Sequence, residues 1–163
     1  MTVTLPTVAD THAFGRRLAA VLRAGDLVLL TGPLGAGKTA LAQGIGAGLG
    51  VQGAVTSPTF VIARVHRPSV AGGPAMVHVD AYRLGDVKDP LGEIDALDLD
   101  ATLEDSVTLV EWGEGLVEQL ADDHLELCLT RHDDDTRTVD LVPHGAAWET
   151  RLGGGLQDLP HVD

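Results

Sequence analysis

The sequence feature that most constrains this chain is the run Gly32-Pro33-Leu34-Gly35-Ala36-Gly37-Lys38-Thr39, which matches G-x-x-x-x-G-K-[ST] throughout. Its glycines permit positive φ angles, so successive backbone amides can turn inward around a phosphate. Lys38 is expected to reach the β- and γ-phosphates of a nucleotide, and the Thr39 hydroxyl to ligate Mg²⁺. The motif therefore predicts a P-loop that binds a nucleoside triphosphate with magnesium.

The sequence around the motif supplies the strand and the helix that a P-loop requires. Residues 27–30 are apolar on both faces, as in a central parallel strand. After the motif, apolar residues at helical spacing mark one face of a helix that ends at Gly50. Three glycines inside this helix weaken it by about 1 kcal/mol each relative to alanine, so we expect tertiary packing to stabilise it. They are Gly44, Gly46 and Gly48.

The remaining pattern predicts an α/β domain over residues 1–145 and a loose, Gly-rich C-terminal tail over residues 146–163. A helix capped by Asp10 or Thr11 and ended by Gly25 should precede the P-loop. Strands are predicted at 2–5, 60–65, 76–80, 107–111, 125–131 and 136–142, the last two as an antiparallel hairpin, with short helices within 91–103 and 116–120.

Two acids at predicted strand ends are candidates for magnesium and catalytic chemistry. Asp80 ends the strand Met-Val-His-Val-Asp, and Glu111 ends the strand Val-Thr-Leu-Val-Glu. A P-loop site needs an acid of this kind near its magnesium ion. Lys38, Asp80 and Glu111 are therefore the predicted catalytic residues.

The composition argues against direct binding to nucleic acid. The chain has 11 Lys and Arg against 24 Asp and Glu, which gives a net charge of −13 and a surface that repels phosphate backbones. The single cysteine, Cys128, excludes an intrachain disulfide and is expected to be a quiet strand residue. No signal peptide and no apolar run of about 20 residues is seen, so a cytoplasmic protein without membrane contact is expected.

Taken together, four signatures in order resemble the TsaE (YjeE) family, the bacterial ATPase component of tRNA threonylcarbamoyladenosine synthesis. They are the P-loop, Ser57-Pro58-Thr59-Phe60, His78-Val79-Asp80-Ala81-Tyr82-Arg83-Leu84 and Val110-Glu111-Trp112-Gly113-Glu114. The resemblance covers about residues 2–145. It departs from the family at Ala81, where many relatives have a larger apolar residue, and in the tail after Gly145.

The resemblance implies a P-loop NTPase-like three-layer fold with a mostly parallel central sheet and antiparallel additions. It implies that Thr39 and Glu111 hold Mg²⁺, that Asp80 acts in hydrolysis, and that Thr11 lies near the adenine of ATP. The loop of residues 57–60 would act as a switch near the γ-phosphate. It also implies partners similar to TsaB and TsaD, through which alone the chain would meet tRNA.

Several alternatives stay open at this point. A small-molecule kinase has a similar length, but it needs clustered arginines to clamp its acceptor, and none cluster between the P-loop and Glu111. A nucleotide-gated binding module without turnover is a third reading. Trp112 is interpreted as packing, or as a contact to nucleotide or partner. His78 and His132 are expected to be structural rather than metal ligands.

Overall fold

The chain folds around one mixed β-sheet with four parallel strands at its centre. A computed structural model describes residues 1–33, 35–55, 63–69, 73–80, 104–112 and 122–155. Within these residues the strand order is β1-β7-β6-β2-β5-β4-β3. The central strands are β6 (His124–Arg131), β2 (Leu27–Thr31), β5 (Ser106–Glu111) and β4 (Ala75–Asp80), each parallel to its neighbours in that set. This confirms the predicted α/β fold with a mostly parallel centre.

Antiparallel strands extend the sheet at both edges. β7 (Arg137–His144) pairs with β6 as the predicted hairpin, and β1 (Thr2–Leu5) pairs with β7. At the other edge β3 (Ala63–His66) runs antiparallel to β4. Residues 60–62 of the predicted strand 60–65, and the predicted helices within 91–103 and 116–120, lie outside the described residues.

Both faces of the central strands are buried, as a three-layer fold requires. On one face, Val28 and Leu30 belong to the same core cluster as the apolar side chains of α1 (Val8–Ala19) and α2 (Lys38–Leu49). The alternate residues of these strands, such as Leu29 and Val110, are also buried. None of the helices that the structure describes has the length and apolar character needed to cross a membrane.

The first helix starts earlier and ends earlier than the sequence pattern suggested. Thr7 is its N-cap, and it forms a capping box with Asp10, whose carboxylate accepts from the Thr7 amide. The prediction of a cap at Asp10 or Thr11 is therefore wrong by three or four residues, because Asp10 serves as the third helical residue of the box. The helix ends at Ala19 rather than at Gly25, since turns follow it.

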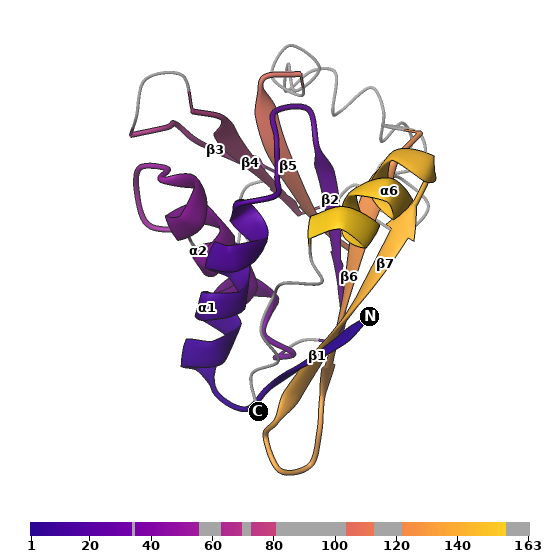
Figure 1. Ribbon diagram of the computed structural model, residues 1–163. Helices are drawn as coiled ribbons and strands as arrows, with labels where there is room; N and C mark the ends of the chain where they lie inside the picture. The colour runs from indigo at the N-terminus through magenta and orange to yellow at the C-terminus, as the bar shows by residue number, and fades with distance from the viewer. Residues whose placement is uncertain (34, 56–62, 70–72, 81–103, 113–121, 156–163) are drawn as a thin grey trace, which may run out of the picture.

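Close contact between α1 and α2 explains two of the three glycines that weaken α2, Gly44 and Gly48, whereas Gly46 faces Val55 and Val51. The two helices lie side by side in Figure 1, and glycines from both sit where they touch. A Cβ atom on Gly15 would lie 2.8 Å from the backbone nitrogen of Ile45, and one on Gly48 would lie 2.6 Å from Cβ of Ala19. A Cβ atom on Gly44 would collide with the carbonyl oxygen of His12. Glycine at these positions lowers the helix propensity of α2, but it is the residue that allows the two helix backbones to come this close.

The expected loose tail is a helix over its first ten residues. α6 spans Ala146–Gly155 and lies beside β7 in Figure 1. Its Trp148 is buried in the main core, and Arg151 donates to both carboxylate oxygens of Asp26 at 2.8 Å. The prediction failed because these long-range contacts, rather than local helix propensity, stabilise a Gly-rich segment. Residues 156–163 lie outside the described part of the chain.

The contact between the helices predicts an unusual response to alanine. Gly44→Ala should lower the free energy of unfolding by about 2 kcal/mol, because overpacking against His12 outweighs the gain in helix propensity. Ala47→Gly, the reverse change at an exposed position of α2, should cost about 1 kcal/mol from propensity alone. Urea denaturation measures both. If Gly44→Ala stabilises the protein, the close helix contact is wrong.

Candidate nucleotide-binding site

The loop between β2 and α2 has the backbone shape of a phosphate cradle. Its glycines Gly32, Gly35 and Gly37 have φ angles of 143°, 82° and 105°, which side-chain-bearing residues rarely adopt. At Gly32, a Cβ atom would also lie 2.7 Å from the carbonyl oxygen of Leu129 on β6. Pro33 accepts a hydrogen bond from the buried Ala36 amide at 3.1 Å, which closes the turn. Leu34 lies outside the described residues.

The start of α2 is suited to an anion. Its N-cap is Gly37, which makes no side-chain capping hydrogen bond, and its first turn contains no acidic residue. The amides of a helix start that lack a cap, together with the positive end of the helix dipole, favour a bound phosphate. Thr39, the second residue of α2, is half-buried at this end.

The Lys38 side chain folds back onto the loop, and the Trp112 ring packs against its ammonium group. The Lys38 ammonium donates to the Gly32 carbonyl at 2.8 Å and sits 3.6 Å from the centroid of the Trp112 ring. Trp112 follows β5 directly and has a φ angle of 60°, a left-handed conformation that non-glycine residues seldom adopt. Its indole is 38% exposed, so one edge of the site is an accessible aromatic surface. Trp112 is thus a neighbour of the P-loop lysine rather than a core residue.

The two candidate acids lie next to each other in adjacent strands. Asp80 and Glu111 are Cα partners in the β4–β5 pair, and Glu111 is also paired with Leu30 of β2, two residues before the loop. Both carboxylates are buried. The parallel register thus brings the ends of β2, β5 and β4 together, at the edge where α/β sheets bind ligands.

A buried histidine holds the Glu111 carboxylate. Nε2 of His78 lies 3.1 Å from Oε2 of Glu111, and the imidazole is completely buried. His78 is therefore the polar partner that the sequence favoured, and the sequence did not reveal which acid it would meet. Because an ionised carboxylate only accepts hydrogen bonds, the imidazole nitrogen is the donor.

The residue types present fit Mg²⁺ with a nucleotide. No group of three or more His, Cys, Asp or Glu side chains in the described residues forms a self-contained metal site. Mg²⁺ bound with a nucleotide needs no such cage, because it keeps several waters and takes one or two protein oxygens besides the phosphates. The Thr39 hydroxyl and the Glu111 carboxylate supply oxygens of that kind.

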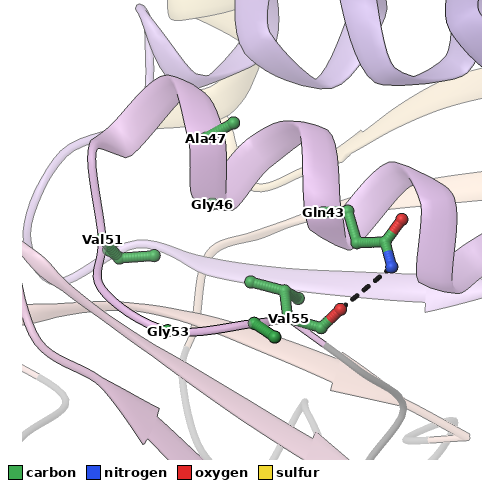
Figure 2. A pocket seen from close by; sticks show the side chains of 7 residues that line it. Gln43, Gly46, Ala47, Val51, Gly53 and Val55 are labelled. Carbon is green, nitrogen blue, oxygen red and sulfur yellow. Dashed lines mark hydrogen bonds between the residues drawn. The ribbon is translucent and has the colours of Figure 1, made fainter.

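Two other predicted site elements are placed less directly. Thr11 lies in the first turns of α1, where it is buried and its hydroxyl donates to the Thr7 carbonyl at 3.4 Å. Its contact with adenine stays a prediction. The switch-like loop Ser57-Pro58-Thr59-Phe60 lies outside the described residues. Val55 comes shortly before that loop in the chain, and its carbonyl accepts a hydrogen bond from Gln43 of α2 at 3.0 Å (Figure 2). This bond attaches the segment that leads to the loop to the helix that carries Lys38.

The same segment and α2 enclose a hollow of about 390 Å³. Figure 2 shows Gln43 at one end of it and Val51 at the other. Gln43 also meets α1, since its Oε1 lies 3.0 Å from Nε2 of His12. The Gln43 side chain therefore connects α2, which carries it, with α1 at His12 and with the segment after α2 at Val55.

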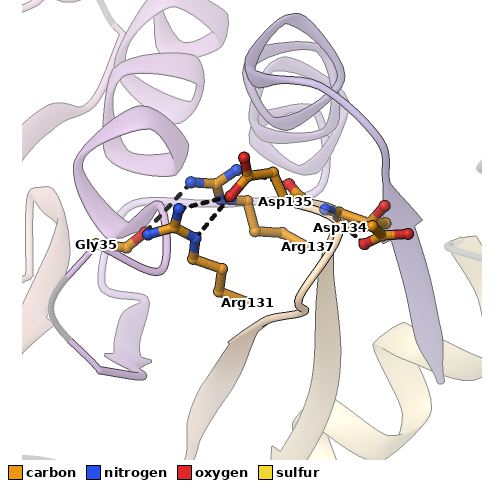
Figure 3. Close-up of polar contacts among 6 residues, drawn as sticks. Gly35, Arg131, Asp134, Asp135 and Arg137 are labelled. Carbon is orange, nitrogen blue, oxygen red and sulfur yellow. Dashed lines mark hydrogen bonds and ion pairs between the residues drawn. The ribbon is translucent and has the colours of Figure 1, made fainter.

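A pair of arginines near the P-loop was missed from the sequence. Arg137 donates to the Gly35 carbonyl at 3.4 Å and to the Asp135 carbonyl at 2.7 Å. Arg131 donates to the Asp135 carboxylate from Nε at 3.0 Å and from a second nitrogen (Figure 3). Arginines that clamp a ligand were expected between the P-loop and Glu111, whereas these two lie on the later hairpin.

Hydrogen bonding and burial shift the pKa values of three side chains on or near the hairpin. The hydrogen bond from Arg131 lowers the pKa of Asp135, and the hydrogen bond with Thr136 lowers the pKa of Asp134. Both carboxylates are thus held in the ionised form. Burial raises the pKa of the Cys128 thiol on β6, which supports the expected unreactive strand residue. His132 bonds Thr138 in the hairpin, as a structural histidine would.

The family model described as "Threonylcarbamoyl adenosine biosynthesis protein TsaE" matches residues 5–139. The chain belongs to the TsaE family. Proteins named tRNA threonylcarbamoyladenosine biosynthesis protein TsaE are similar to it in several bacteria. The Streptomyces coelicolor protein is 59% identical over 140 residues, covering 83% of this chain and 92% of that one. The Mycobacterium bovis protein is 59% identical over 132 residues, covering 80% and 79%.

A solved structure shares the fold of this TsaE family member. Bacillus subtilis YdiB superposes with a TM-score of 0.76 at 26% sequence identity, covering 98% of this chain and 96% of that one. The match in fold therefore extends beyond the residues that the family model covers.

The buried pair of His78 and Glu111 predicts a measurable stability effect. His78→Leu should lower the free energy of unfolding by about 2–3 kcal/mol, because it leaves a buried carboxylate without its hydrogen bond. His66→Leu is the matched control, since buried His66 meets the neutral carbonyl of Gln52 and should cost about 1 kcal/mol. The double variant His78→Leu/Glu111→Leu should recover part of the loss. Equal effects of the two single histidine changes would contradict the pairing.

Proposed function

We propose that the chain is the Mg²⁺-dependent, ATP-binding and ATP-hydrolysing subunit of a tRNA-modifying assembly. It would act with TsaB- and TsaD-like partners to make threonylcarbamoyladenosine in tRNAs that read codons starting with A. The observation that carries the proposal is the convergence of a glycine cradle, the uncapped start of α2 and two strand-end carboxylates. Membership of the TsaE family supports the role in tRNA modification.

The proposed roles follow from where each side chain lies. The loop amides and the start of α2 would bind phosphate, and Lys38 would exchange its Gly32 carbonyl for phosphate oxygens. Thr39 and Glu111 would hold the magnesium ion, which supplies charge neutralisation at the phosphates when bound. Asp80, beside Glu111 in the next strand, would orient the attacking water.

His78 supports this division of the two acids. It donates to Glu111, so it fixes one carboxylate oxygen and leaves the other for a metal. Asp80 is the direct partner of Glu111 on β4, at the same buried edge of the sheet. Two adjacent carboxylates of which one is held by His78 are suited to two different tasks.

Contact with tRNA is proposed to occur through the partners only. A net charge of −13 opposes the counterion release that drives binding to nucleic acid. The kinase alternative receives no support from the family match, because the similar proteins reported above are named TsaE.

Partner dependence tests the proposal directly. The isolated protein should release phosphate from ATP slowly, and TsaB- and TsaD-like partners should change that rate by at least about tenfold, because a missing arginine finger alone can cost 10³–10⁵ in rate. Lys38→Ala should abolish the activity with and without partners while the melting temperature stays unchanged. A labelled small molecule instead of free phosphate would indicate a kinase. A rate that no partner alters would contradict the assembly.

The two carboxylates should fail in different ways. Glu111→Gln should weaken the Mg²⁺-dependent part of ATP binding and slow hydrolysis together, because the amide replaces an anionic metal ligand while it can still accept from His78. Asp80→Asn should leave ATP affinity within about twofold and slow hydrolysis at least about a hundredfold, because orientation acts in the transition state. Calorimetry with and without Mg²⁺, together with phosphate release, separates the roles. The opposite pattern would exchange the two assignments.

A further inference from the structure

The tip of the β6–β7 hairpin brings two guanidinium groups to the P-loop. Arg131 is the last residue of β6 and Arg137 the first of β7, and the two are Cα partners across the hairpin. Figure 3 shows both side chains reaching toward Gly35. Neither arginine is among the residues to which the proposed function assigns a role.

Donors on both arginines remain unused by the residues that the structure describes. Arg137 uses its two terminal nitrogens for the Asp135 and Gly35 carbonyls, and Nε makes no hydrogen bond within the described residues. That nitrogen lies 3.8 Å from where a Cβ atom on Gly37 would be. Nη1 of Arg131 also makes no hydrogen bond within the described residues, and it lies 3.8 Å from where a Cβ atom on Gly35 would be. Charged donors that make no hydrogen bond within the described residues therefore lie beside Gly35 and Gly37 of the phosphate loop.

Strand order places these donors opposite the acids. β2, which leads into the P-loop, pairs with β5 on one side and β6 on the other. Glu111 and Trp112 lie on the β5 side, and the arginines lie on the β6 side. In the proposed site Glu111 would hold the magnesium ion, which would place the β- and γ-phosphates on the β5 side. The α-phosphate and the ribose would then extend toward β6 and the hairpin.

The hairpin turn also has room for part of a ligand. An open hollow of about 270 Å³ is lined by Arg131, His132, Asp133 and Asp135. The Asp135 carboxylate accepts two hydrogen bonds from the Arg131 guanidinium, so it would compete with a bound phosphate for that side chain. Asp135 has a φ angle of 65°, a conformation that asparagine tolerates well. Its charge can therefore be removed without changing the turn.

We propose that Arg137 and Arg131 bind the nucleoside 5′-phosphate half of the nucleotide from the β6–β7 hairpin, and that Asp135 restrains Arg131 until nucleotide binds. The inference rests on the proposed function, since it requires a nucleotide in the P-loop. It gives the site a division of labour. Lys38, Thr39 and Glu111 hold the β- and γ-phosphates with magnesium, and the hairpin distinguishes a nucleotide from an inorganic phosphate chain.

Titration calorimetry with Mg·ATP and with Mg·pyrophosphate tests the division, because pyrophosphate can fill only the β- and γ-positions. Arg137→Ala should weaken ATP binding about tenfold and pyrophosphate binding less than twofold. Arg137→Lys should be intermediate, because it keeps the charge and loses the planar fork. Asp135→Asn should tighten ATP binding two- to fivefold, and this gain should vanish in the Arg131→Ala background. Arg17→Ala, an exposed arginine on α1, removes the same charge and should change neither.

Lys38→Ala separates failure of this inference from failure of the proposed function. If Lys38→Ala leaves both affinities unchanged, the P-loop does not bind the nucleotide and the proposed function fails. If Lys38→Ala weakens both ligands but Arg137→Ala affects neither, or both equally, the hairpin only braces the loop and the inference is overturned. Melting temperatures within about 2 °C of the parent protein establish that each variant is folded.

Discussion

The parallel pairing of β2 with β5 on one side and β6 on the other is the constraint on which the site depends. Because parallel strands end at the same edge, this pairing places the loop after β2 between the ends of its two neighbours. The loop itself supplies only a glycine-rich turn of backbone and the start of α2. What surrounds it, carboxylates at β5 and β4 or arginines at β6 and β7, is decided by strand order and not by the loop sequence.

This arrangement gives a strongly acidic chain a site with separated charges. The carboxylates of Asp80 and Glu111 lie on one side of β2, and the guanidinium groups of the hairpin lie on the other. Lys38 lies between them, against the Gly32 carbonyl and the Trp112 ring. Both acids are buried, and His78 holds Glu111. The arginines lie on the hairpin, where the Asp135 carboxylate accepts hydrogen bonds from Arg131.

Most of the sheet and the core of the site could be predicted from the sequence, because the signals were local. The P-loop pattern, the apolar run of β2 and the acids that end β4 and β5 each occupy a few consecutive residues. The hairpin followed from alternation on both sides of three aspartates. These elements need no information about distant contacts, so their bounds agree with the structure to within a few residues.

The features that were missed depend on pairs of residues far apart in the chain. α6 is stabilised by Trp148 in the core and by Arg151 at Asp26, which lie more than a hundred positions apart. Arg137 meets Gly35 across a similar separation. The partner of His78 became clear only from the β4–β5 register. Sequence patterns name such residues, but only the fold says which of them meet.

The glycine contact between α1 and α2 has a mechanical consequence for the site. Where the backbones of two helices touch, as at Gly44 and His12, one helix cannot slide or rotate against the other without separating atoms already in contact. α2 begins with Lys38 and Thr39, so the residues proposed to bind phosphate belong to a stiff pair of helices. A movement coupled to the proposed nucleotide would then involve the strand ends and loops around these two helices, while the helices keep their relative position.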